Sequence, residues 1–372
     1  MLSQRSHRWS WSRGIPALVA ATLVLAACGG DDGTEGSTES SATDDGPREL
    51  TLSNYENYMP EDLIPAFEEE TGITVNVVNH ASNEEIVGKF DASNGDPGFD
   101  IVVIASPFAQ SLTQRGWLAE IDSAKIPNMS ELAQEATEMD YDPGNTHSVP
   151  YTWGTTGLCY RTDLVDEEID SWNDLLEPSD ELKGKVTMLG TDRWLMLPAL
   201  KVLGYSANTT DTAELEAAAD ILKETKDSLQ AYDDTTFYSR LVSGEASLVQ
   251  AWDGWCNYAI AEDKNVEWVV PEEGSDVWVD VFAVPASSEH QDEAMEFINF
   301  VLQPDVHATV AELVYYNVPN PAAMELVDPA LLKQFENIGI SSAELNAGNE
   351  PLTDVSEAGQ EWARVVSEIK AS

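Results

Sequence analysis

The clearest hydrophobic pattern in the chain is the stretch Val277–Pro285, in which apolar residues alternate around a single acid. β-Branched and aromatic residues with a period of two, followed by a proline, predict a β-strand. One face of this strand is expected to carry Trp278, Asp280, Phe282 and Val284. A carboxylate on such a face must be paired, hydrogen-bonded or protonated, because loss of its hydration is costly. Asp280 is therefore either a structural residue satisfied by backbone N–H groups or water, or a residue that binds a cation from outside.

From residue 49 onward the pattern predicts alternating strands and helices. The expected strands are Glu49–Ser53, Ile73–Val78, Phe99–Ile104, Lys185–Leu189, Ala246–Trp252 and Val266–Val270. The expected helices are Glu61–Thr71, Trp194–Leu203, Thr212–Lys226 and Asp292–Leu302. We expect Glu61 and Asp62 in the first turn of the first helix and Gly72 as its C-cap. Alternating elements of this kind predict α/β layers with a mostly parallel sheet.

Parallel sheets bind ligands in the loops that follow the carboxyl ends of their strands. The loops expected there are Tyr55–Tyr58 and Ala105–Phe108. The segment Pro150–Leu158 is rich in Thr and Gly and predicts a turn-rich entry to a second α/β region. The chain is long enough after residue 48 for two lobes, each with its own core.

The N-terminus has the pattern of an export signal. Arg5, Arg8 and Arg13 precede the apolar run Ile15–Ala27, which is too short for a membrane span. The ending Leu-Ala-Ala-Cys resembles the bacterial lipobox, which implies removal of residues 1–27 and lipid on Cys28. The alternative is an ordinary secreted protein cut nearby.

Residues 28–47 contain mostly Gly, Asp, Glu, Ser and Thr, a composition that does not bury enough surface to fold. We interpret this segment as a lipid-anchored tether, with a reach of roughly 25 Å for a flexible chain of about 20 residues. The chain is then expected outside the cytoplasm, held at the bacterial cell membrane by its lipid.

The charge of the chain is strongly acidic, with 19 basic and 67 acidic residues and a formal net charge of −48. Repulsion excludes nucleic acid as a partner. A cationic ligand would be attracted. Most of these acids must nevertheless form a solvated surface, which also fits a salty habitat, so the charge alone does not identify a ligand.

The remaining cysteines, Cys159 and Cys256, leave two interpretations open. Outside the cytoplasm they form either a disulfide or two separately buried thiols.

Sequence motifs for catalysis or metal binding are absent. The chain has no G-x-S-x-G elbow, no P-loop and no H-E-x-x-H motif. Its histidines have no ligand spacing, and its three cysteines form no zinc pattern. We therefore predict no enzymatic activity, no cofactor and no metal.

Aromatic residues and carboxylates that fall in predicted loops are the remaining candidates for chemistry. They are Tyr55, Glu56, Tyr58, Trp153, Trp252, Asp253, Trp255, Trp278, Asp280 and Tyr316. Aromatic faces attract alkylammonium cations, and carboxylates add charge-assisted hydrogen bonds. For each tryptophan the alternative is packing in a core or between lobes.

Segments that carry a family resemblance extend along nearly the whole chain. They are Asn54–Pro60, Phe67–Ile73, Ser82–Glu84, Phe99–Val103, Pro150–Gly154, Leu203–Ser206, Asn208–Asp211, Trp278–Pro285, Ile298–Val306 and Pro319–Asn320. In these the chain resembles the extracytoplasmic spermidine/putrescine-binding proteins of ABC transporters. The resemblance implies a two-lobed periplasmic-binding-protein fold (type 2-like), each lobe a mixed sheet flanked by helices. Lobe 1 would comprise residues 48–157 plus 279–326, and lobe 2 residues 158–278 plus 327–372, with crossing hinge segments between them.

The ligand positions of that family fall here on residues that are partly kept and partly changed. Those kept in type are Tyr55, Glu56, Tyr58, Trp252, Trp278, Asp280 and Tyr316. The acidic pair that grips the far amine of spermidine matches Thr191 and Trp194. A serine matches Ala105, next to Ser106, and a late glutamine matches Leu352. One end of a polyamine site is thus kept, and Asp192, Asp253 or Glu56 are the candidates for a second carboxylate.

The resemblance implies a monomeric binding protein that captures a polyamine-like cation and delivers it to an ABC permease. Putrescine, or another alkylammonium compound held mainly by aromatic side chains, fits as well as spermidine. Within the same fold, the adjacent Tyr315 and Tyr316 leave a ferric-ion site as an alternative. From another class, a secreted hydrolase such as a glycosidase would need two carboxylates facing each other across a cleft. A purely adhesive or sensory lipoprotein would differ in having no permease.

Overall fold

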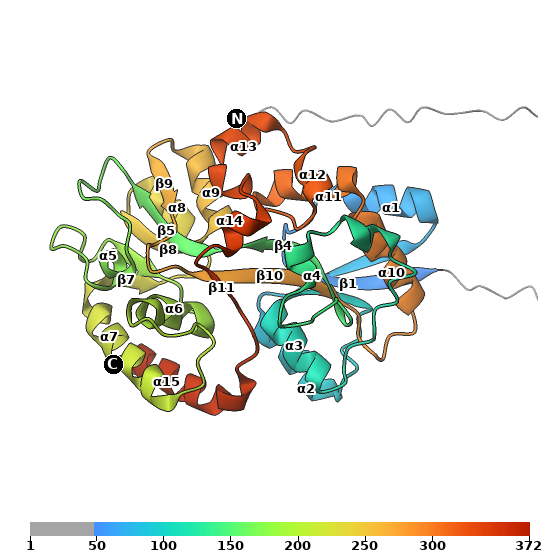
Figure 1. The fold of residues 1–372 in the computed structure, drawn as a ribbon, viewed down its shortest axis with the longest axis horizontal. Helices are drawn as coiled ribbons and strands as arrows, with labels where there is room; N and C mark the ends of the chain where they lie inside the picture. The colour runs from blue at the N-terminus through green and yellow to red at the C-terminus, as the bar shows by residue number, and fades with distance from the viewer. Residues whose placement is uncertain (1–47) are drawn as a thin grey trace, which may run out of the picture. The chain divides into compact units, whose positions relative to one another are not determined.

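The computed structural model describes residues 48–372, so the predicted signal peptide, the tether and the lipidation of Cys28 lie outside the described residues. The strands are β1 Glu49–Asn54, β2 Thr74–Asn79, β3 Ile101–Ala105, β4 Ser148–Gly154, β5 Thr156–Arg161, β6 Val186–Met188, β7 Leu229–Tyr232, β8 Leu248–Trp252, β9 Val266–Val269, β10 Asp276–Ala283 and β11 Glu350–Pro351. They form two separate sheets, each covered by helices (Figure 1).

The helices account for most of the remaining chain. They are α1 Leu63–Thr71, α2 Asn83–Ser93, α3 Ser106–Gln114, α4 Gln134–Thr137, α5 Trp172–Leu176, α6 Asp192–Val202, α7 Thr212–Thr225, α8 Phe237–Ser243, α9 Asp253–Glu262, α10 Gln291–Val301, α11 Pro304–Val314, α12 Pro321–Met324, α13 Pro329–Gln334, α14 Ser342–Asn346 and α15 Gly359–Ala371. Short 3₁₀ turns lie at Pro127–Glu131, Lys226–Ser228, Glu336–Ile338 and Ser356–Ala358. No helix in residues 48–372 combines the length and the apolar character that a bilayer crossing requires.

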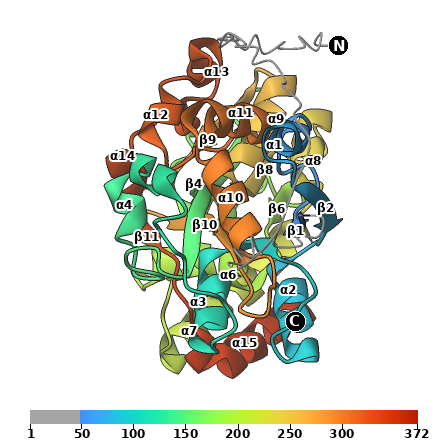
Figure 2. The same cartoon turned by 90° about the vertical axis from the view of Figure 1, so that its right-hand side faces the viewer.

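The first sheet has the strand order β11-β10-β3-β1-β2, and β4 also pairs with β10. Strands β1, β2 and β3 run parallel, whereas β10 is antiparallel to β3 and β4. Helices α1 and α10 cover one face through Phe67, Phe297 and Phe300, whose rings meet edge to face. Helices α2 and α3 cover the opposite face (Figures 1 and 2). The sheet is thus mixed, as the resemblance implies, and helices cover both of its faces. The antiparallel strand β10 departs from the mostly parallel sheet that the alternating pattern predicts.

The second sheet has the strand order β7-β6-β8-β5-β9. Strand β6 is parallel to β7 and β8, and β5 is antiparallel to β8 and β9. Helices α5, α8 and α9 contact its strands, while α15 packs on α6 and α7. The last helix of the chain therefore belongs to the second sheet's side, although β11, which precedes it, pairs with the first sheet.

Strand β10 confirms the alternation predicted for the stretch at residues 277–285. Trp278, Phe282 and Val284 pack in the core cluster that contains α1 and α10. Val277, Val279, Val281 and Ala283 pack in the cluster that contains α2 and α3. The strand also runs between the two halves of the structure (Figure 1). It therefore places one of its faces, with Asp280, at the junction of both halves.

Two chain crossings between the sheets are tied to each other by hydrogen bonds. β4 passes through Thr155 into β5, and β10 begins at Asp276. The Thr155 hydroxyl donates to the Asp276 carbonyl oxygen over 2.7 Å, and the Thr156 N–H donates to Asp276 Oδ1 over 2.9 Å. The Ser275 hydroxyl donates to the Thr156 carbonyl oxygen over 2.5 Å. These bonds hold the crossing strands in a fixed register at the point where the sheets separate.

The prediction of a turn-rich segment at 150–158 is wrong, because these residues form β4 and β5 and are all buried. The glycines there serve close packing rather than turning. A Cβ at Gly154 would lie 2.4 Å from Trp278 Cζ2, and one at Gly157 would lie 2.7 Å from Trp268 Cη2. Ladder pairing and aromatic neighbours thus override the turn composition of this segment.

Two smaller predictions also fail. Glu61 and Asp62 do not lie in the first helical turn, because Leu63 N–H bonds to the Pro60 carbonyl and α1 begins only at Leu63. Gly72 is the C-cap as predicted, with φ of 72°. The loop expected at 105–108 is absent, because β3 ends at Ala105 and α3 begins at Ser106.

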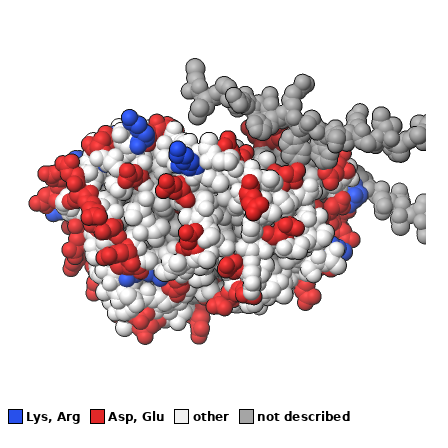
Figure 3. Space-filling view, turned by 45° about the horizontal axis from the view of Figure 1, so that its top comes forward, with Lys and Arg blue, Asp and Glu red and all other residues white. Residues whose placement is uncertain are grey.

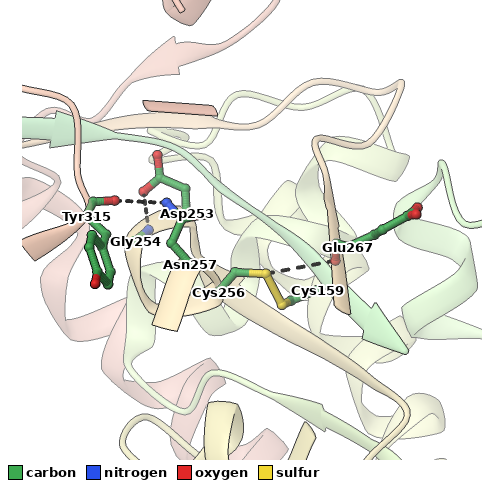
Figure 4. The surroundings of a disulfide bond; sticks show 7 residues. All are labelled: Cys159, Asp253, Gly254, Cys256, Asn257, Glu267 and Tyr315. Atoms are coloured by element: carbon green, nitrogen blue, oxygen red, sulfur yellow. Dashed lines mark hydrogen bonds between the residues drawn. A yellow bond between two sulfur atoms is a disulfide. The ribbon is translucent and has the colours of Figure 1, made fainter. Parts of the chain in front are cut away.

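The two cysteines that the sequence left open form a disulfide, Cys159–Cys256 (Figure 4). It joins β5 to α9 across 97 residues of chain, and both cysteines are buried. Closing a loop of this length stabilises a fold by about 4–5 kcal/mol in the chain-entropy model. The second sheet is thereby cross-linked covalently to its covering helix.

Acidic side chains are spread over the face drawn in Figure 3, with few basic ones between them. Many of the basic residues pair with acids, as Arg364 does with Glu216, Glu361 and Glu368. Such exposed pairs contribute little to stability. The surface therefore has the strongly negative field that the composition indicated.

Candidate functional site

A cavity of about 250 Å³ lies between groups from both sheets. Most of the ligand-binding residues expected from the sequence line it: Tyr55, Glu56, Tyr58, Thr191, Trp194, Trp252, Trp278, Asp280 and Tyr316. Ser106 and Asp253 do not line it. Trp255, one of the aromatic candidates, does.

The carboxylate of Asp280 is the main polar group on the first sheet's side. It projects from the middle of β10, where it is half-buried, and its Oδ2 accepts a hydrogen bond of 2.7 Å from the Tyr58 hydroxyl. No donor in residues 48–372 reaches Oδ1. Burial raises the pKa of Asp280 to about 6, although the Tyr58 bond opposes this shift. An ionised Asp280 therefore lacks sufficient partners within the chain itself.

The loop after β1 supplies the tyrosines around Asp280. The Tyr58 hydroxyl also lies 2.8 Å from Thr152 Oγ1, and the Tyr55 hydroxyl donates to Asn83 Oδ1 over 2.7 Å. The same Asn83 oxygen accepts the Ala105 N–H over 2.9 Å, which joins the ends of β1 and β3. Burial raises the pKa values of Tyr55 and Tyr58 well above their usual range, so both phenols stay protonated. They can donate hydrogen bonds but add no charge.

Two aromatic walls face the cavity. Trp278 and Tyr316 meet edge to face at 4.7 Å between ring centroids on the first sheet's side. Trp194 and Trp252 meet edge to face at 5.3 Å on the second sheet's side. Aromatic faces turned toward a common space stabilise an alkylammonium chain by cation–π attraction and by apolar contact.

The orientation of Trp194 depends on a buried acid at the start of β10. Trp194 Nε1 donates to Asp276 Oδ2 over 2.9 Å, and Asp276 is fully buried. Burial raises the pKa of Asp276, while the donors Thr156 and Trp194 oppose the shift. The same carboxylate therefore holds a wall residue and a crossing strand. In contrast, Trp278 Nε1 is buried and has no acceptor in the described part of the chain.

Asp253 lies beneath the cavity rather than in its wall. It begins α9, is 1% exposed, and accepts the Gly254 N–H at Oδ1 over 2.9 Å. The space where Gly154 lacks a Cβ is bounded by Trp278 Cζ2 and by both Asp253 oxygens, so this acid packs behind Trp278. Burial raises its pKa well above the usual range. An acid in that position does not reach a ligand in the cavity.

The other predicted acids and the serine occupy separate surroundings. Asp192 points outward, where its Oδ1 lies 3.4 Å from Lys370 Nζ. Ser106 is fully buried at the start of α3, and its hydroxyl has no partner in residues 48–372. Leu352 is buried outside the cavity lining. Of the three acids expected to replace a second carboxylate, only Glu56 lines the cavity.

Sequence reasoning missed two groups of lining residues. One is Ala81–Glu84 at the start of α2, and the other is the pair Asp234 and Thr235 after β7. The segment Ser82–Glu84 was recognised only as part of the resemblance. β7 was not predicted, so the strand-end rule could not be applied to the acid that follows it.

The adjacent tyrosines do not form a chelating pair. Tyr316 lines the cavity, whereas Tyr315 has φ of 55° and packs on Tyr258 and Phe335. Among residues 48–372 no group of His, Cys, Asp and Glu side chains is arranged to hold a metal ion. The geometry therefore does not favour the ferric-ion alternative.

Comparisons with known proteins agree with the geometry. Residues 62–336 match the family model described as bacterial extracellular solute-binding protein. The chain is 32% identical over 362 residues to the spermidine/putrescine-binding periplasmic protein of Escherichia coli, covering 97% of this chain and 99% of that one. It is 31% identical over 309 residues to the putrescine-binding periplasmic protein PotF of the same organism, covering 78% and 82%.

Solved structures show the same fold. The spermidine/putrescine ABC transporter substrate-binding protein PotD of Streptococcus pneumoniae superposes with a TM-score of 0.75 at 28% identity, over 87% of this chain and 99% of that one. The TpPotD lipoprotein of Treponema pallidum gives 0.78 at 26% identity, over 86% and 99%. The two-sheet α/β architecture expected from the sequence is thus confirmed.

Proposed function

Because this chain belongs to the bacterial extracellular solute-binding proteins, we propose that it captures a polyamine-like cation outside the cytoplasm and delivers it to the permease of an ABC importer. The observation that carries this proposal is the Asp280 carboxylate, which faces an aromatic cavity with one oxygen that no donor in residues 48–372 reaches. An ammonium group supplies the missing donors and the opposite charge.

The chemistry of capture follows from the two kinds of lining group. The ammonium group binds Asp280 by charge-assisted hydrogen bonds, while the alkyl chain lies between the walls formed by Trp278 and Trp252. The negative field of the whole protein raises the local concentration of cations and hence the association rate. The chain performs no catalysis in this proposal, since its role ends with transfer of the unchanged solute.

Closure of the two lobes couples binding to delivery. Lobe 1 comprises residues 48–157 plus 279–326, and lobe 2 residues 158–278 plus 327–372, with the crossings at Thr155–Thr156 and Ser275–Asp276 as the hinge. Two segments are exceptions to these bounds. Residues 276–278 form the start of β10 in the first sheet, and α14 contacts α4 on the first sheet's side. A ligand that touches both walls favours the closed form by its higher affinity for that form.

The location of the protein is proposed from the N-terminal sequence and the relatives. A lipid on Cys28 would hold the chain at the membrane surface, and residues 28–47 would give the body room to reach its permease. The relatives from Escherichia coli are periplasmic proteins, in line with an extracytoplasmic location.

Isothermal titration calorimetry of the purified protein with putrescine and spermidine tests the proposal. We expect saturable binding, and a melting temperature that rises with amine concentration as binding linkage requires. Sodium chloride at matched ionic strength is the control for general screening of the acidic surface. Absence of both heat and thermal shift at millimolar amine would refute the assignment.

A further inference from the structure

The cavity contains a second carboxylate, Asp234, which comes from the opposite side to Asp280. Asp234 follows β7 of the second sheet, whereas Asp280 lies in β10 between two strands of the first. Both side chains line the same cavity, which the aromatic residues of the two walls also line. Negative groups are therefore supplied by each half of the structure.

The side chain of Asp234 is held in a defined orientation. Its Oδ1 accepts the backbone N–H groups of Gly190 over 2.8 Å and Thr191 over 3.2 Å, at the start of α6. The positive end of the helix dipole stabilises an anion at that point. No donor in residues 48–372 reaches Oδ2. One carboxylate oxygen is thus used for positioning, and the other is left for a ligand.

The neighbouring residue keeps the turn itself in place. Asp233 is buried and accepts hydrogen bonds from Thr235 N–H, from Thr236, and from Arg240 Nε over 2.8 Å. The turn after β7 is therefore anchored by Asp233 and does not depend on Asp234 for its shape. This separation of roles leaves the Asp234 carboxylate available for binding.

The remaining acids of the cavity do not offer the same arrangement. Glu56 and Glu84 are both exposed, and both come from the first sheet's side, in the loop after β1 and in the first turn of α2. Among the described residues, Asp234 is the carboxylate that the second sheet's side contributes to the lining. A cation bound to Asp234 and another bound to Asp280 would connect the two sides directly.

Resting on the proposed function, we propose that Asp234 binds the second ammonium group of the ligand, so that the solute is a diamine or longer polyamine. Asp280 holds one terminal ammonium and Asp234 holds the other, with the methylene chain along Trp278 and Trp252. A monoamine satisfies only one of the two carboxylates and leaves the other unpaired. The preference for a diamine therefore arises from two carboxylates on opposite sides of the cavity, and not from one cluster of acids.

Matched amines and matched variants test this assignment by calorimetry. Putrescine and butylamine have the same carbon chain and differ in the second ammonium group. Asp234→Asn removes the charge but keeps an oxygen that accepts from Gly190 and Thr191, so the turn is preserved. Asp192→Asn is the control, since it removes a charge from the same helix start on the outer surface.

We expect Asp234→Asn to weaken putrescine binding by roughly 10- to 100-fold, as for loss of a hydrogen bond to a charged group. Butylamine affinity should change less than about twofold, because a single ammonium group is held by Asp280. The ratio of the two affinities, compared between wild type and variant, isolates the contact of the second ammonium with Asp234. Asp192→Asn should leave both affinities close to wild type.

Two outcomes would overturn the inference. Equal losses for putrescine and butylamine in Asp234→Asn would make the residue structural, and an unchanged putrescine affinity would remove it from the site. In both cases binding of putrescine by the wild type leaves the proposed function intact. If the wild type binds neither amine, the proposed function itself fails.

Discussion

The two sides of the cavity are built in different ways. On the first sheet's side, Asp280 lies within β10, which pairs with β3 on one edge and with β4 on the other, so the sheet itself fixes the residue. On the second sheet's side, Asp234 lies in a turn and is fixed by two backbone amides of another element. The alternating pattern of its own strand thus sets the direction of the Asp280 side chain. The orientation of Asp234 depends instead on contacts between segments over 40 residues apart. Four predictions test this difference, from the largest expected effect to the smallest.

The covalent link of the second sheet should have the largest effect on stability. Replacing both Cys159 and Cys256 by alanine is expected to lower the free energy of unfolding by about 3–5 kcal/mol. Urea denaturation followed by tryptophan fluorescence measures the loss. The first sheet has no such link among the described residues, so the variant's second sheet should lose hydrogen-exchange protection first. Equal loss of protection in both sheets would show that the disulfide stabilises the whole fold and not the second sheet in particular.

The first sheet's carboxylate should dominate affinity. Asp280→Asn is expected to weaken binding of both putrescine and butylamine by roughly 100-fold or more, since a paired buried charge is lost. At pH 7 the same change should raise the stability of the empty protein by about 1–2 kcal/mol, because a half-buried carboxylate with a raised pKa disfavours folding. Calorimetry and thermal unfolding test the two effects. A variant that keeps its affinity would return Asp280 to a structural role.

The two tryptophan walls should respond unequally to the same substitution. Trp194→Phe removes the donor to Asp276 Oδ2 and is expected to lower stability by about 1–3 kcal/mol through the unsatisfied acid. Trp278→Phe removes an Nε1 that has no acceptor in residues 48–372, so it serves as the matched control and should cost less. Thermal unfolding of the empty proteins gives the comparison. If Trp278→Phe lowers the stability more than Trp194→Phe does, then packing, and not the hydrogen bond to Asp276, is the main stabilising contact of Trp194.

Amine affinity should fall as the pH falls, with the smallest of the four effects. The folded-state pKa of Asp280 is about 6, so the group is largely ionised at pH 7 and largely protonated at pH 5. Putrescine affinity is therefore expected to drop about tenfold between these values. The stability of the empty protein depends on pH in the opposite direction. The contribution of Asp280 to the free energy of unfolding is complete below about pH 4 and is lost as the pH rises through 6. Calorimetry in Asp280→Asn should show a flat profile, and a persistent slope would assign the effect to another acid.

Much of the fold was predictable because β10 and the parallel strands β1 and β3 carry strong local patterns. The segment at 150–158 was not, since its Thr and Gly residues are typical of turns and only pairing with β10 and β8 makes them strands. The start of α1 was placed too early because the acids at 61 and 62 fit a helix but belong to the preceding turn.

The site was predicted unevenly for related physical reasons. Strand residues such as Trp278 and Asp280 were found because alternation fixes the direction of a side chain. Asp253 was expected in the cavity but is buried, because the strand β8 ends at Trp252 and the first turn of α9 points the next side chain behind Trp278. Asp234 was missed because β7 is short and weakly patterned, and one more acid carries no signal in a chain with 67.

Gly154 limits how this cavity can be redesigned for another cation. Even one added methyl group there would meet Trp278 Cζ2 at 2.4 Å and Asp253 Oδ1 at 2.5 Å. Substitution of Gly154 therefore cannot be used to move Trp278. Changes to the cavity have to be made at the exposed residues at the start of α2 or in the turn after β7. Sensors for longer or bulkier amines built on this protein would vary those two segments and leave the crossing strands untouched.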